Sequence, residues 1–543
     1  MKIGEKIAIC RNKRGYSQEE LADLMNVSRQ SIYKWEMNLA QPQVEKVLPL
    51  CDVLGISADT LLNEAAVIEN DEGAKTQKVR KNKYFGTDGF RGEVGTVLTA
   101  EHAFKVGRFL GWYFASPLSG CRKVGYRPRI VIGKDTRRSS YTLEYALAAG
   151  ITASGGDAYI LHVITTPGVS YVTRVDEFDC GIMITASHNP FYDNGIKILN
   201  KYGEKFDDDK TALVEAYLDG ELDKLGISGK DIPFAKKDSI GCIVDYVAGR
   251  NRYVGYLISV ASHSYKEKRI ALDCANGASW MIAKSVFEAL GAAVYQIGNE
   301  PNGLNVNLDC GSTHIENLQK FVKENRMDMG FAFDGDADRC IAVDENGSVV
   351  DGDKILYVLA KRLVSRDMLD GNTVVLTVMS NSGLMNTFKK EKIDYATTKV
   401  GDRFVYECME ENGYRLGGEQ SGHIILRKYA TTGDGVLTAI MLTEEVCDTK
   451  LSLGKLTKAV KLYPQKTVNV RVSDKKAVVD NEAVQAEYKA VNDEIDGNGR
   501  ILLRESGTEP VIRVMCEFDD ENMCEAYIKR IVDVIYKEGL ANE

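Results

Sequence analysis

Residues 329–339 read MGFAFDGDADR, an apolar run followed at once by a loop that carries three aspartates. The apolar run predicts a strand that is buried on both faces. Asp334, Asp336 and Asp338 would then lie at the carboxyl end of that strand, where open α/β sheets bind their ligands. Alternate carboxylates in a tight loop can converge on one hard cation. Mg²⁺ is the natural choice, because it combines few carboxylates with phosphate oxygens.

The same strand pattern recurs through most of the chain. Apolar, β-branched runs occur at RIVIG (129–133), CGIMIT (180–185), RIALD (269–273) and TVVLTV (373–378). Helical patterns such as 101–116 and 140–154 separate them, and this alternation predicts βαβ units with parallel sheets. The last 80 or so residues instead predict an α+β unit that ends in a helix near 521–537. A chain of 543 residues exceeds one core, so we expect three parallel-sheet α/β domains and a C-terminal α+β domain.

The composition and the N-terminal sequence indicate the cellular compartment of the protein and argue against some classes of binding partner. The net charge of -9 argues against a broad electrostatic grip on nucleic acid. The twelve cysteines form no CxxC pair, which argues against zinc ribbons and thioredoxin-like redox sites. The first twenty residues lack the apolar core of a signal peptide, and no run of about 18 apolar residues would span a membrane. We therefore expect a cytoplasmic protein with free thiols and no membrane partner.

Residues 1–66 differ from the rest and predict an all-α domain of five short helices. One helix is expected at 18–25, and Ser28 is expected to cap another that runs to about Met37. The segment QEELADLMNVSRQSIYKWEM (18–37) resembles the helix-turn-helix of the Xre/Cro family of DNA-binding proteins. The resemblance implies contacts to base edges and to one phosphate. The residues expected to make them are Ser28, Arg29, Gln30, Tyr33 and Lys34.

A second interpretation of this module is a bundle that serves oligomerisation or docking. Residues 1–64 carry eight basic and nine acidic side chains. That balance is low for an autonomous DNA binder, so DNA affinity is expected to need a homodimer. The polar, charged stretch 67–83 that follows predicts a linker.

Five motifs follow the linker, and together they suit phosphoryl transfer. They are FGTDGFRG (85–92), TASHNP (185–190), DGDADR (334–339), GEQSGH (418–423) and RESGTEP (504–510). Ser187, beside His188, is a weak nucleophile that needs a base or a metal ion. Lys197 and Arg91 could offset the charge on a moving phosphoryl group. RESGTEP suits a second phosphate, and GEQSGH offers a carboxylate and a histidine to sugar hydroxyls.

All five motifs, in this order, resemble the α-D-phosphohexomutase family over about residues 82–540. The resemblance implies four domains around one cleft, expected at 84–240, 241–343, 344–462 and 463–543. It implies a hexose phosphate substrate, a phosphoserine, Mg²⁺, and a hexose 1,6-bisphosphate as intermediate and activator. Within the family, the likeness is greatest to the branch that interconverts glucosamine 6-phosphate and glucosamine 1-phosphate.

The resemblance also implies a role for each motif residue. Ser187 would carry the phosphate and complete the Mg²⁺ site of Asp334, Asp336 and Asp338. The transfer site would be lined by Arg91, His188, Lys197 and Arg339. The sugar would be held by Glu419, Ser421 and His423. The phosphate that is not transferred would be gripped by Arg504, Ser506, Gly507, Thr508 and Arg513.

Two alternatives stay open at this point. One is a phosphoglucomutase or phosphomannomutase, which would use the same sugar loop. The other is a transcription regulator whose enzyme-like part only senses sugar phosphates. Three residues depart from the usual pattern: Ala337 stands where glycine is common, Cys340 follows the aspartate motif, and Glu505 adds a carboxylate to the phosphate loop. An inward-facing carboxylate there would weaken phosphate binding by about 1 kcal/mol.

Overall fold

The structure is a computed structural model of the chain. It describes residues 2–62, 83–120, 125–495, 499–506 and 511–542, apart from Gly15, Ser17, Asn26, Leu39, Gly55, Ser57 and Thr87. The chain divides into two compact units, Met1–Lys81 and Asn82–Glu543. Within the described ranges, no helix combines the length and the apolar character needed to cross a bilayer.

The first unit is a bundle of five helices, as the sequence predicts. They are α1 (Ile3–Lys13), α2 (Gln18–Met25), α3 (Arg29–Glu36), α4 (Val44–Leu54) and α5 (Ala58–Leu62). Ser28 caps α3, because its hydroxyl accepts a hydrogen bond from the Ser31 amide at 3.2 Å. Glu36 at the other end of α3 is buried and accepts hydrogen bonds from Arg11 of α1 at 2.5 Å and Gln18 of α2 at 2.6 Å. These contacts fix α3 against both preceding helices.

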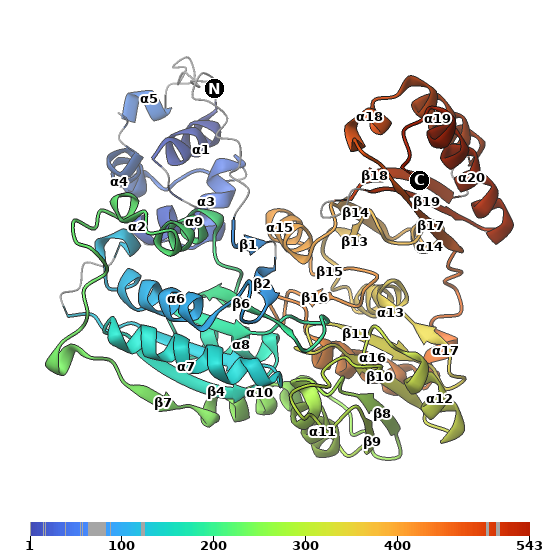
Figure 1. Cartoon of the computed structure of the whole chain (residues 1–543), viewed down its shortest axis with the longest axis horizontal. Coiled ribbons are helices and arrows are strands. Elements are labelled where there is room, and N and C mark those ends of the chain that lie inside the picture. The colour runs from blue at the N-terminus through green and yellow to red at the C-terminus, as the bar shows by residue number, and fades with distance from the viewer. Residues whose placement is uncertain are drawn as a thin grey trace. The chain divides into compact units, whose positions relative to one another are not determined.

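The second unit begins with a seven-stranded sheet in the order β1-β2-β6-β5-β3-β4-β7. Its elements are β1 (Phe85–Gly86), β2 (Gly89–Glu93), α6 (Ala100–Tyr113), β3 (Arg129–Lys134), α7 (Arg138–Ala153), β4 (Asp157–Val163), α8 (Thr166–Val175), β5 (Cys180–Ile184), β6 (Asp193–Asn200), α9 (Asp208–Leu218), β7 (Ile243–Asp245) and α10 (Val247–Val260). Helices α6 and α7 lie side by side (Figure 1). Their close approach depends on glycine, because a Cβ on Gly150 would lie 2.2 Å from the Phe104 carbonyl oxygen.

Two smaller sheets follow, in the orders β12-β11-β10-β8-β9 and β14-β13-β15-β16. The segment that forms the first of these sheets consists of β8 (Arg269–Asp273), α11 (Ser279–Ala289), β9 (Ala293–Ile297), α12 (Glu316–Glu324), β10 (Met329–Phe333), β11 (Cys340–Val343) and β12 (Val349–Val350). The segment that forms the second consists of α13 (Gly352–Ser365), β13 (Thr373–Thr377), α14 (Ser382–Lys390), β14 (Asp394–Thr398), α15 (Asp402–Asn412), β15 (Leu416–Gly418), β16 (Ile424–Leu426), α16 (Gly435–Thr449) and α17 (Leu453–Leu456). One apolar core runs from Val131 of the seven-stranded sheet through Phe331 to Leu376, so the three sheets pack together.

The C-terminal sheet is antiparallel, in the order β17-β19-β18, and it has its own apolar core. Its elements are β17 (Gln465–Arg471), α18 (Lys475–Val479), α19 (Glu482–Ile495), β18 (Gly499–Glu505), β19 (Val511–Phe518) and α20 (Glu521–Lys537). Strands followed by a terminal helix match the α+β expectation.

The α/β class is confirmed, and the strands predicted as parallel pair in parallel, as β3 does with β5, β10 with β8 and β13 with β14. Each of the first three sheets also contains antiparallel pairs, so the sheets are mixed. Strand β6 runs antiparallel to β5, β11 to β10, and β16 to β15. The reason is the length of the connections. A parallel neighbour needs a crossover of a dozen or more residues, whereas the eight residues 185–192 join β5 to β6. The motifs that were predicted as turns after parallel strands are therefore hairpin loops.

Two sheets also extend past the boundaries expected for their domains. Strand β7 of the first sheet lies beyond residue 240, and β12 of the second lies beyond residue 343. Both are edge strands of two or three residues, and such short segments carry no periodic signal.

Polar contacts at the start of α14 join the third sheet to the fourth. Glu517 of β19 is fully buried and accepts a hydrogen bond from the Ser382 amide at 2.6 Å. Asp353 of α13 accepts one from the Asn381 amide at 2.7 Å. Its other carboxylate oxygen is buried and has no partner among the residues that the structure describes. Burial and the neighbouring Asp351 raise the pKa of Asp353 to about 7.

Asp353→Asn is expected to stabilise the protein at pH 8, with a gain that shrinks toward pH 4. The folded-state pKa lies above the unfolded value of 3.8, so the stability contributed by the bound proton is complete below pH 4 and lost as the pH rises through 7. Asparagine keeps the acceptor and never ionises. The gain has an upper limit of about 4 kcal/mol. Thermal unfolding between pH 4 and 8 measures it, with the exposed Asp394→Asn as control, and a gain that did not vary with pH would contradict this account.

Candidate active site

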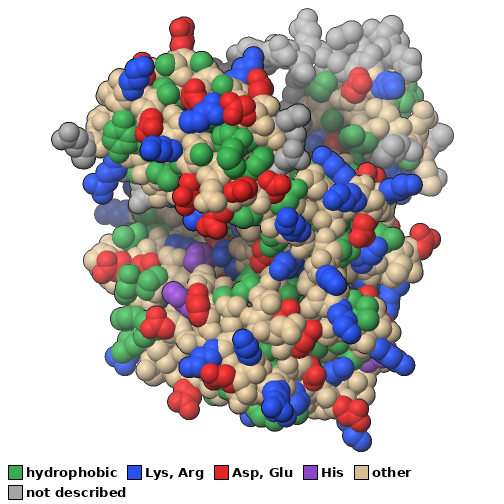
Figure 2. Space-filling view, turned by 90° about the vertical axis from the view of Figure 1, so that its right-hand side faces the viewer, with side chains coloured by type: hydrophobic (Ala, Val, Ile, Leu, Met, Phe, Trp, Pro, Cys, Tyr) green, Lys and Arg blue, Asp and Glu red, His purple; other side chains and the backbone are tan. Residues whose placement is uncertain are grey.

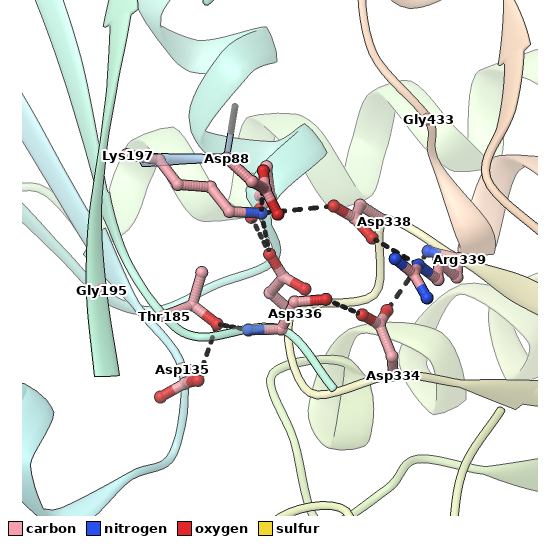
Figure 3. Close-up of polar contacts among 12 residues, drawn as sticks. Asp88, Asp135, Thr185, Gly195, Lys197, Asp334, Asp336, Asp338, Arg339 and Gly433 are labelled. Atoms are coloured by element: carbon pink, nitrogen blue, oxygen red, sulfur yellow. Dashed lines mark hydrogen bonds and ion pairs between the residues drawn. The ribbon is translucent and has the colours of Figure 1, made fainter. Parts of the chain in front are cut away.

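Three aspartates of one hairpin loop come together at the carboxyl end of β10. Asp334, Asp336 and Asp338 lie between β10 and the antiparallel β11, and all three are buried. One carboxylate oxygen from each lies within 4.8 Å of the others. Figure 3 shows Lys197 on one side of them and Arg339 on the other. This segment, residues 334–339, is called the acidic loop below.

The acidic loop fits a divalent cation. The Oδ1 atoms of Asp336 and Asp338 are buried and have no hydrogen-bond partner among the described residues. Burial, with the neighbouring Asp338 and Asp336 carboxylates, raises the pKa of Asp334 well above its usual value. A cation bound between the three would engage the unpaired oxygens and relieve the repulsion. In the part of the chain that the structure describes, no other group of three His, Cys, Asp or Glu side chains has this geometry.

Ser187 reaches the acidic loop from the hairpin between β5 and β6, residues 185–192, which is called the serine hairpin below. Its side chain is buried, and its hydroxyl donates to Oδ2 of Asp334 at 2.5 Å. Its backbone is left-handed, with φ 51°, a conformation that costs about 1–2 kcal/mol in a residue other than glycine. The structure thus brings the predicted nucleophile into contact with a predicted metal ligand.

His188 lies next to the serine hydroxyl, with Nδ1 3.3 Å from Oγ of Ser187. Burial and the positive charges of Arg339 and Arg91 lower the pKa of His188 to about 4. The ring is therefore neutral at pH 7 and can accept a proton beside Ser187.

Lys197 of β6 is a buried cation on the opposite side of the acidic loop. Its Nζ lies 2.8 Å from Asp336, 3.3 Å from Asp338 and 3.4 Å from Asp88. Burial alone would lower the pKa of Lys197, but the three carboxylates raise it above its usual value. Lys197 is therefore a fixed positive charge.

Two arginines complete the positive side of the site. Arg91 of β2 pairs with Asp88, and the Arg339 amide donates to Asp334 at 3.2 Å. The Nε atoms of both arginines are buried without a hydrogen-bond partner among the described residues. Buried donors of this kind are suited to a phosphoryl oxygen.

The GEQSGH motif forms the hairpin between β15 and β16. Glu419 accepts a hydrogen bond from the Gly401 amide at 2.9 Å, and the exposed Ser421 lies 3.4 Å from the same carboxylate. His423 differs from both, because it is buried and its Nδ1 lies 3.7 Å from Oδ1 of Asp338. Its surroundings place it beside the acidic loop, whereas Glu419 is half-buried and Ser421 is exposed.

Arg504 and Arg513 stand directly opposite each other in the antiparallel pair of β18 and β19. Their side chains share one face, and like charges in this position are unfavourable unless an anion lies between them. Glu505 is opposite Ile512 and is exposed. Because successive side chains of a strand alternate, Glu505 points away from the arginine face, so the cost of an inward-facing carboxylate does not apply.

The rest of the phosphate-loop motif is described only in part. Ser506 is buried, and its carbonyl accepts a hydrogen bond from Lys475 at 2.6 Å. Gly507 and Thr508 lie outside the described residues.

The surface of the molecule is hollowed on the side that lies at the right in Figure 1. Figure 2 shows a recess there, below the upper lobe, with histidine, lysine and arginine side chains around it.

The residues predicted to contact DNA lie on α3 and its cap. Ser28, Gln30 and Lys34 are exposed, and Arg29 and Tyr33 are half-buried. Positions three and four apart are neighbours on a helix surface. Tyr33 therefore adjoins Arg29 and Gln30, and Lys34 adjoins Gln30, on the side of α3 away from its buried residues.

Comparison with known proteins identifies the family. Models described as Phosphoglucomutase/phosphomannomutase match in order: alpha/beta/alpha domain I at residues 82–224, domain II at 251–347, domain III at 351–463 and the C-terminal domain at 468–534. A Helix-turn-helix model matches residues 7–61. Phosphoglucosamine mutase of Lachnospira eligens is 56% identical over 459 residues, which cover 84% of this chain and 99% of the relative. The chain belongs to the phosphoglucomutase/phosphomannomutase family.

One more relative and two solved structures are similar to the chain. Phosphoglucosamine mutase of Bacillus subtilis is 47% identical over 456 residues, with 84% and 99% coverage. A solved phosphoglucomutase/phosphomannomutase family protein of Burkholderia thailandensis has a TM-score of 0.68 at 22% identity, covering 84% of this chain and 98% of the other. N-acetylphosphoglucosamine mutase of Aspergillus fumigatus has a TM-score of 0.59 at 16% identity, with 84% and 96% coverage. These two structures share the fold.

Two further residues of the site were not singled out in the sequence. Thr166, the first residue of α8, donates its hydroxyl to Oδ2 of Asp336 at 2.5 Å. Asp88 lies between Arg91, Lys197 and a further lysine, and these cations hold its pKa low against the effect of burial. Asp88 belongs to a quoted motif, and Thr166 follows a strand and precedes Pro167, a pattern typical of a helix start at the ligand-binding edge of a sheet.

Gly335→Ala is expected to leave the fold intact but to lower kcat by about 100-fold. A Cβ at this position would lie 2.5 Å from the Ser187 carbonyl oxygen, so the serine hairpin and the acidic loop must separate. A displacement of about 1 Å costs a rate factor of this size. Steady-state kinetics with circular dichroism measures the effect. Gly255→Ala, where a Cβ meets open space, is the control, and a wild-type kcat in Gly335→Ala would contradict the packing.

Proposed function

We propose that the second unit interconverts glucosamine 6-phosphate and glucosamine 1-phosphate. The choice of substrate is supported by the relatives named phosphoglucosamine mutase, which match 84% of the chain at 56% and 47% identity. The reaction is supported by one observation above all. The Ser187 hydroxyl lies 2.5 Å from Asp334, inside a buried group of carboxylates and cations.

In this proposal Ser187 carries a phosphate between the two ends of the hexose. The sugar hydroxyl attacks the phosphorus of phospho-Ser187, so a sugar O–P bond forms and the Oγ–P bond of Ser187 breaks. The proton of the hydroxyl passes to the neutral His188 and from there to Oγ of Ser187. The hexose 1,6-bisphosphate then turns over, and its other phosphate returns to Ser187 by the reverse steps. The same bisphosphate would activate unphosphorylated enzyme.

The charges of the site suit this transfer. Mg²⁺ would be held by the Ser187 phosphate with Asp334, Asp336 and Asp338. When bound, it would neutralise part of the phosphoryl charge as a Lewis acid. Fixed positive charge would come from the buried Lys197 and from the partly buried Arg91 and Arg339. These side chains need little reorganisation because ion pairs already hold them at the site.

Recognition of the substrate is assigned to the two remaining hairpins. Glu419 and Ser421 would contact sugar hydroxyls, and His423 would support the site from beside Asp338. The phosphate that is not transferred would lie against the arginine face of the C-terminal sheet. The residues proposed to hold it are Arg504, Ser506, Gly507, Thr508 and Arg513.

The purified chain is expected to carry a phosphate on Ser187 and to prefer glucosamine phosphates. An intact mass about 80 Da above that of the polypeptide, absent in Ser187→Ala, reports the phosphoserine. Initial rates with glucosamine, glucose and mannose 6-phosphates, in Mg²⁺ and hexose 1,6-bisphosphate, report the preference. Faster turnover of glucose or mannose phosphate would assign a phosphoglucomutase or phosphomannomutase. An unmodified, inactive protein that still binds DNA would favour a sugar-phosphate-sensing regulator.

We further propose that the first unit binds DNA, as a homodimer, through the exposed face of α3. The support is the match to the Helix-turn-helix model and the side chains on that face, since arginine can read guanine and glutamine can read adenine through two hydrogen bonds. Lys34 would contact a phosphate.

The double variant Arg29→Ala with Gln30→Ala is expected to lose specific DNA binding and to keep the wild-type mutase rate. Each lost base contact is worth a factor of about 10 to 100. Selection from random-sequence duplexes followed by footprinting measures binding, and the exposed Gln41→Ala is the control. If the wild-type chain selects no sequence, the unit has a docking role instead.

A further inference from the structure

The carbonyl group of Ser187 is held by two buried side chains that the reaction scheme does not use. Arg137 Nη2 donates to it at 2.9 Å, and Asn307 Nδ2 donates at 2.8 Å. The same two groups donate to the Asn189 carbonyl, at 2.8 and 3.2 Å. A carbonyl oxygen has two lone pairs, and both are used at Ser187. The peptide that follows the reactive serine therefore has a fixed orientation.

Arg137 holds the serine hairpin to its own sheet. Its side chain is completely buried, and its Nε donates to Asp135 at 2.7 Å. Its Nη1 donates to the carbonyls of Pro190 and Asp193. All five N–H groups of the guanidinium are thus used between the end of β3 and the hairpin.

Asn307 belongs to the segment between β9 and α12, so its hydrogen bonds reach the hairpin from the neighbouring sheet. It is 8% exposed, and its own amide donates to the Ala275 carbonyl at 2.9 Å. Its backbone is left-handed, with φ 57°, a conformation in which asparagine is enriched. It also lies against the acidic loop, since a Cβ on Gly335 would be 3.1 Å from Asn307 Nδ2. Asn307 therefore connects the Ser187 carbonyl to the sheet that carries the aspartates.

We propose that Asn307 is a positioning residue that sets the distance between the Ser187 hydroxyl and the carboxylates of the acidic loop. The inference rests on the function proposed above. Arg137 cannot set this distance alone, because its bonds lie within the first sheet and its hairpin. Loss of the Asn307 donor leaves the loops proposed to bind the sugar and the second phosphate unchanged. It therefore slows phosphoryl transfer without weakening substrate binding.

Two variants of the full chain test this. Asn307→Ala removes the donor, and the nearly isosteric Asn307→Asp puts a second acceptor against the Ser187 carbonyl. The measurements are kcat and KM for glucosamine 6-phosphate, and the single-turnover rate at which hexose 1,6-bisphosphate phosphorylates Ser187, followed by intact mass. In both variants kcat and the phosphorylation rate are expected to fall by about tenfold or more, with KM within about twofold of wild type. Loss of two buried hydrogen bonds also lowers the thermal midpoint, so circular dichroism at the assay temperature measures the folded fraction of each variant.

Asn305→Ala is the matched control from the same segment. Its side chain is half-buried and bonds to the Glu300 carbonyl and the Asn302 amide and not to the serine hairpin, so the phosphorylation rate of this variant is expected to equal that of wild type. Wild-type phosphorylation rates in both Asn307 variants would overturn the inference and leave the proposed function standing. An activity loss that merely equals a loss of folded protein would also overturn it, since that shows a structural role. A wild-type chain that neither accepts phosphate nor turns over sugar phosphates would overturn the proposed function, and the inference with it.

Discussion

The crowding of negative charge around the acidic loop is the constraint to which the rest of the catalytic unit responds. Four carboxylates, those of Asp88, Asp334, Asp336 and Asp338, lie among the side chains of Arg91, Lys197 and Arg339. Burial and the neighbouring carboxylates raise the pKa of Asp334. The carboxylate of Asp338 and its neighbours raise the pKa of the adjacent His423 to about 9, against the effect of burial. The buried aspartates are therefore stabilised by protons and by cationic side chains together. A divalent cation on the three aspartates would add two positive charges beside the position proposed for the phosphoryl group, and it would favour the ionised form of Asp334.

Hairpins explain how one chain delivers so many charged side chains to one place. Each of the five motifs joins a pair of antiparallel strands, from β1–β2 at the start of the unit to β18–β19 at its end. A hairpin returns the chain beside itself, so β5 leads to Ser187 and β6 brings Lys197 back to the same edge, opposite Met183 in the ladder. Both ends of each loop are fixed by ladder hydrogen bonds, which restrict the loop more than a crossover connection would. Side chains that must lie within hydrogen-bond distance of each other are thus carried on short, restrained loops.

Local sequence patterns predict the strands and loops that hold the proposed catalytic residues. They do not predict which of these strands and loops contact one another. The apolar run at 329–333 is β10, and the aspartates follow it as expected, because burial and periodicity are local properties. The antiparallel direction of the next strand is not among the predictions, although the eight residues at 185–192 are too few for a crossover. The orientation of Glu505 follows from the alternation of side chains once β18 is recognised. The contact of Thr166 with Asp336 joins residues 170 positions apart. No local pattern encodes such a pair, since it depends on how two separately folded sheets pack.

The hydrogen bond from Ser187 to Asp334 belongs to only one of the two forms that the proposed reaction requires. Oγ donates this bond because it carries a proton, and a phosphorylated Oγ has none. In the phosphorylated form Asp334 would lose its donor and face phosphate oxygens of the same charge, at a buried site where repulsion is strong. A cation between them would restore an attractive contact, so a metal ion would replace the lost proton as the link between the serine hairpin and the acidic loop. The backbone contacts of the hairpin involve carbonyl groups and not Oγ, so phosphorylation removes none of their donors or acceptors. They would therefore keep the two loops in register while the link between their side chains changes.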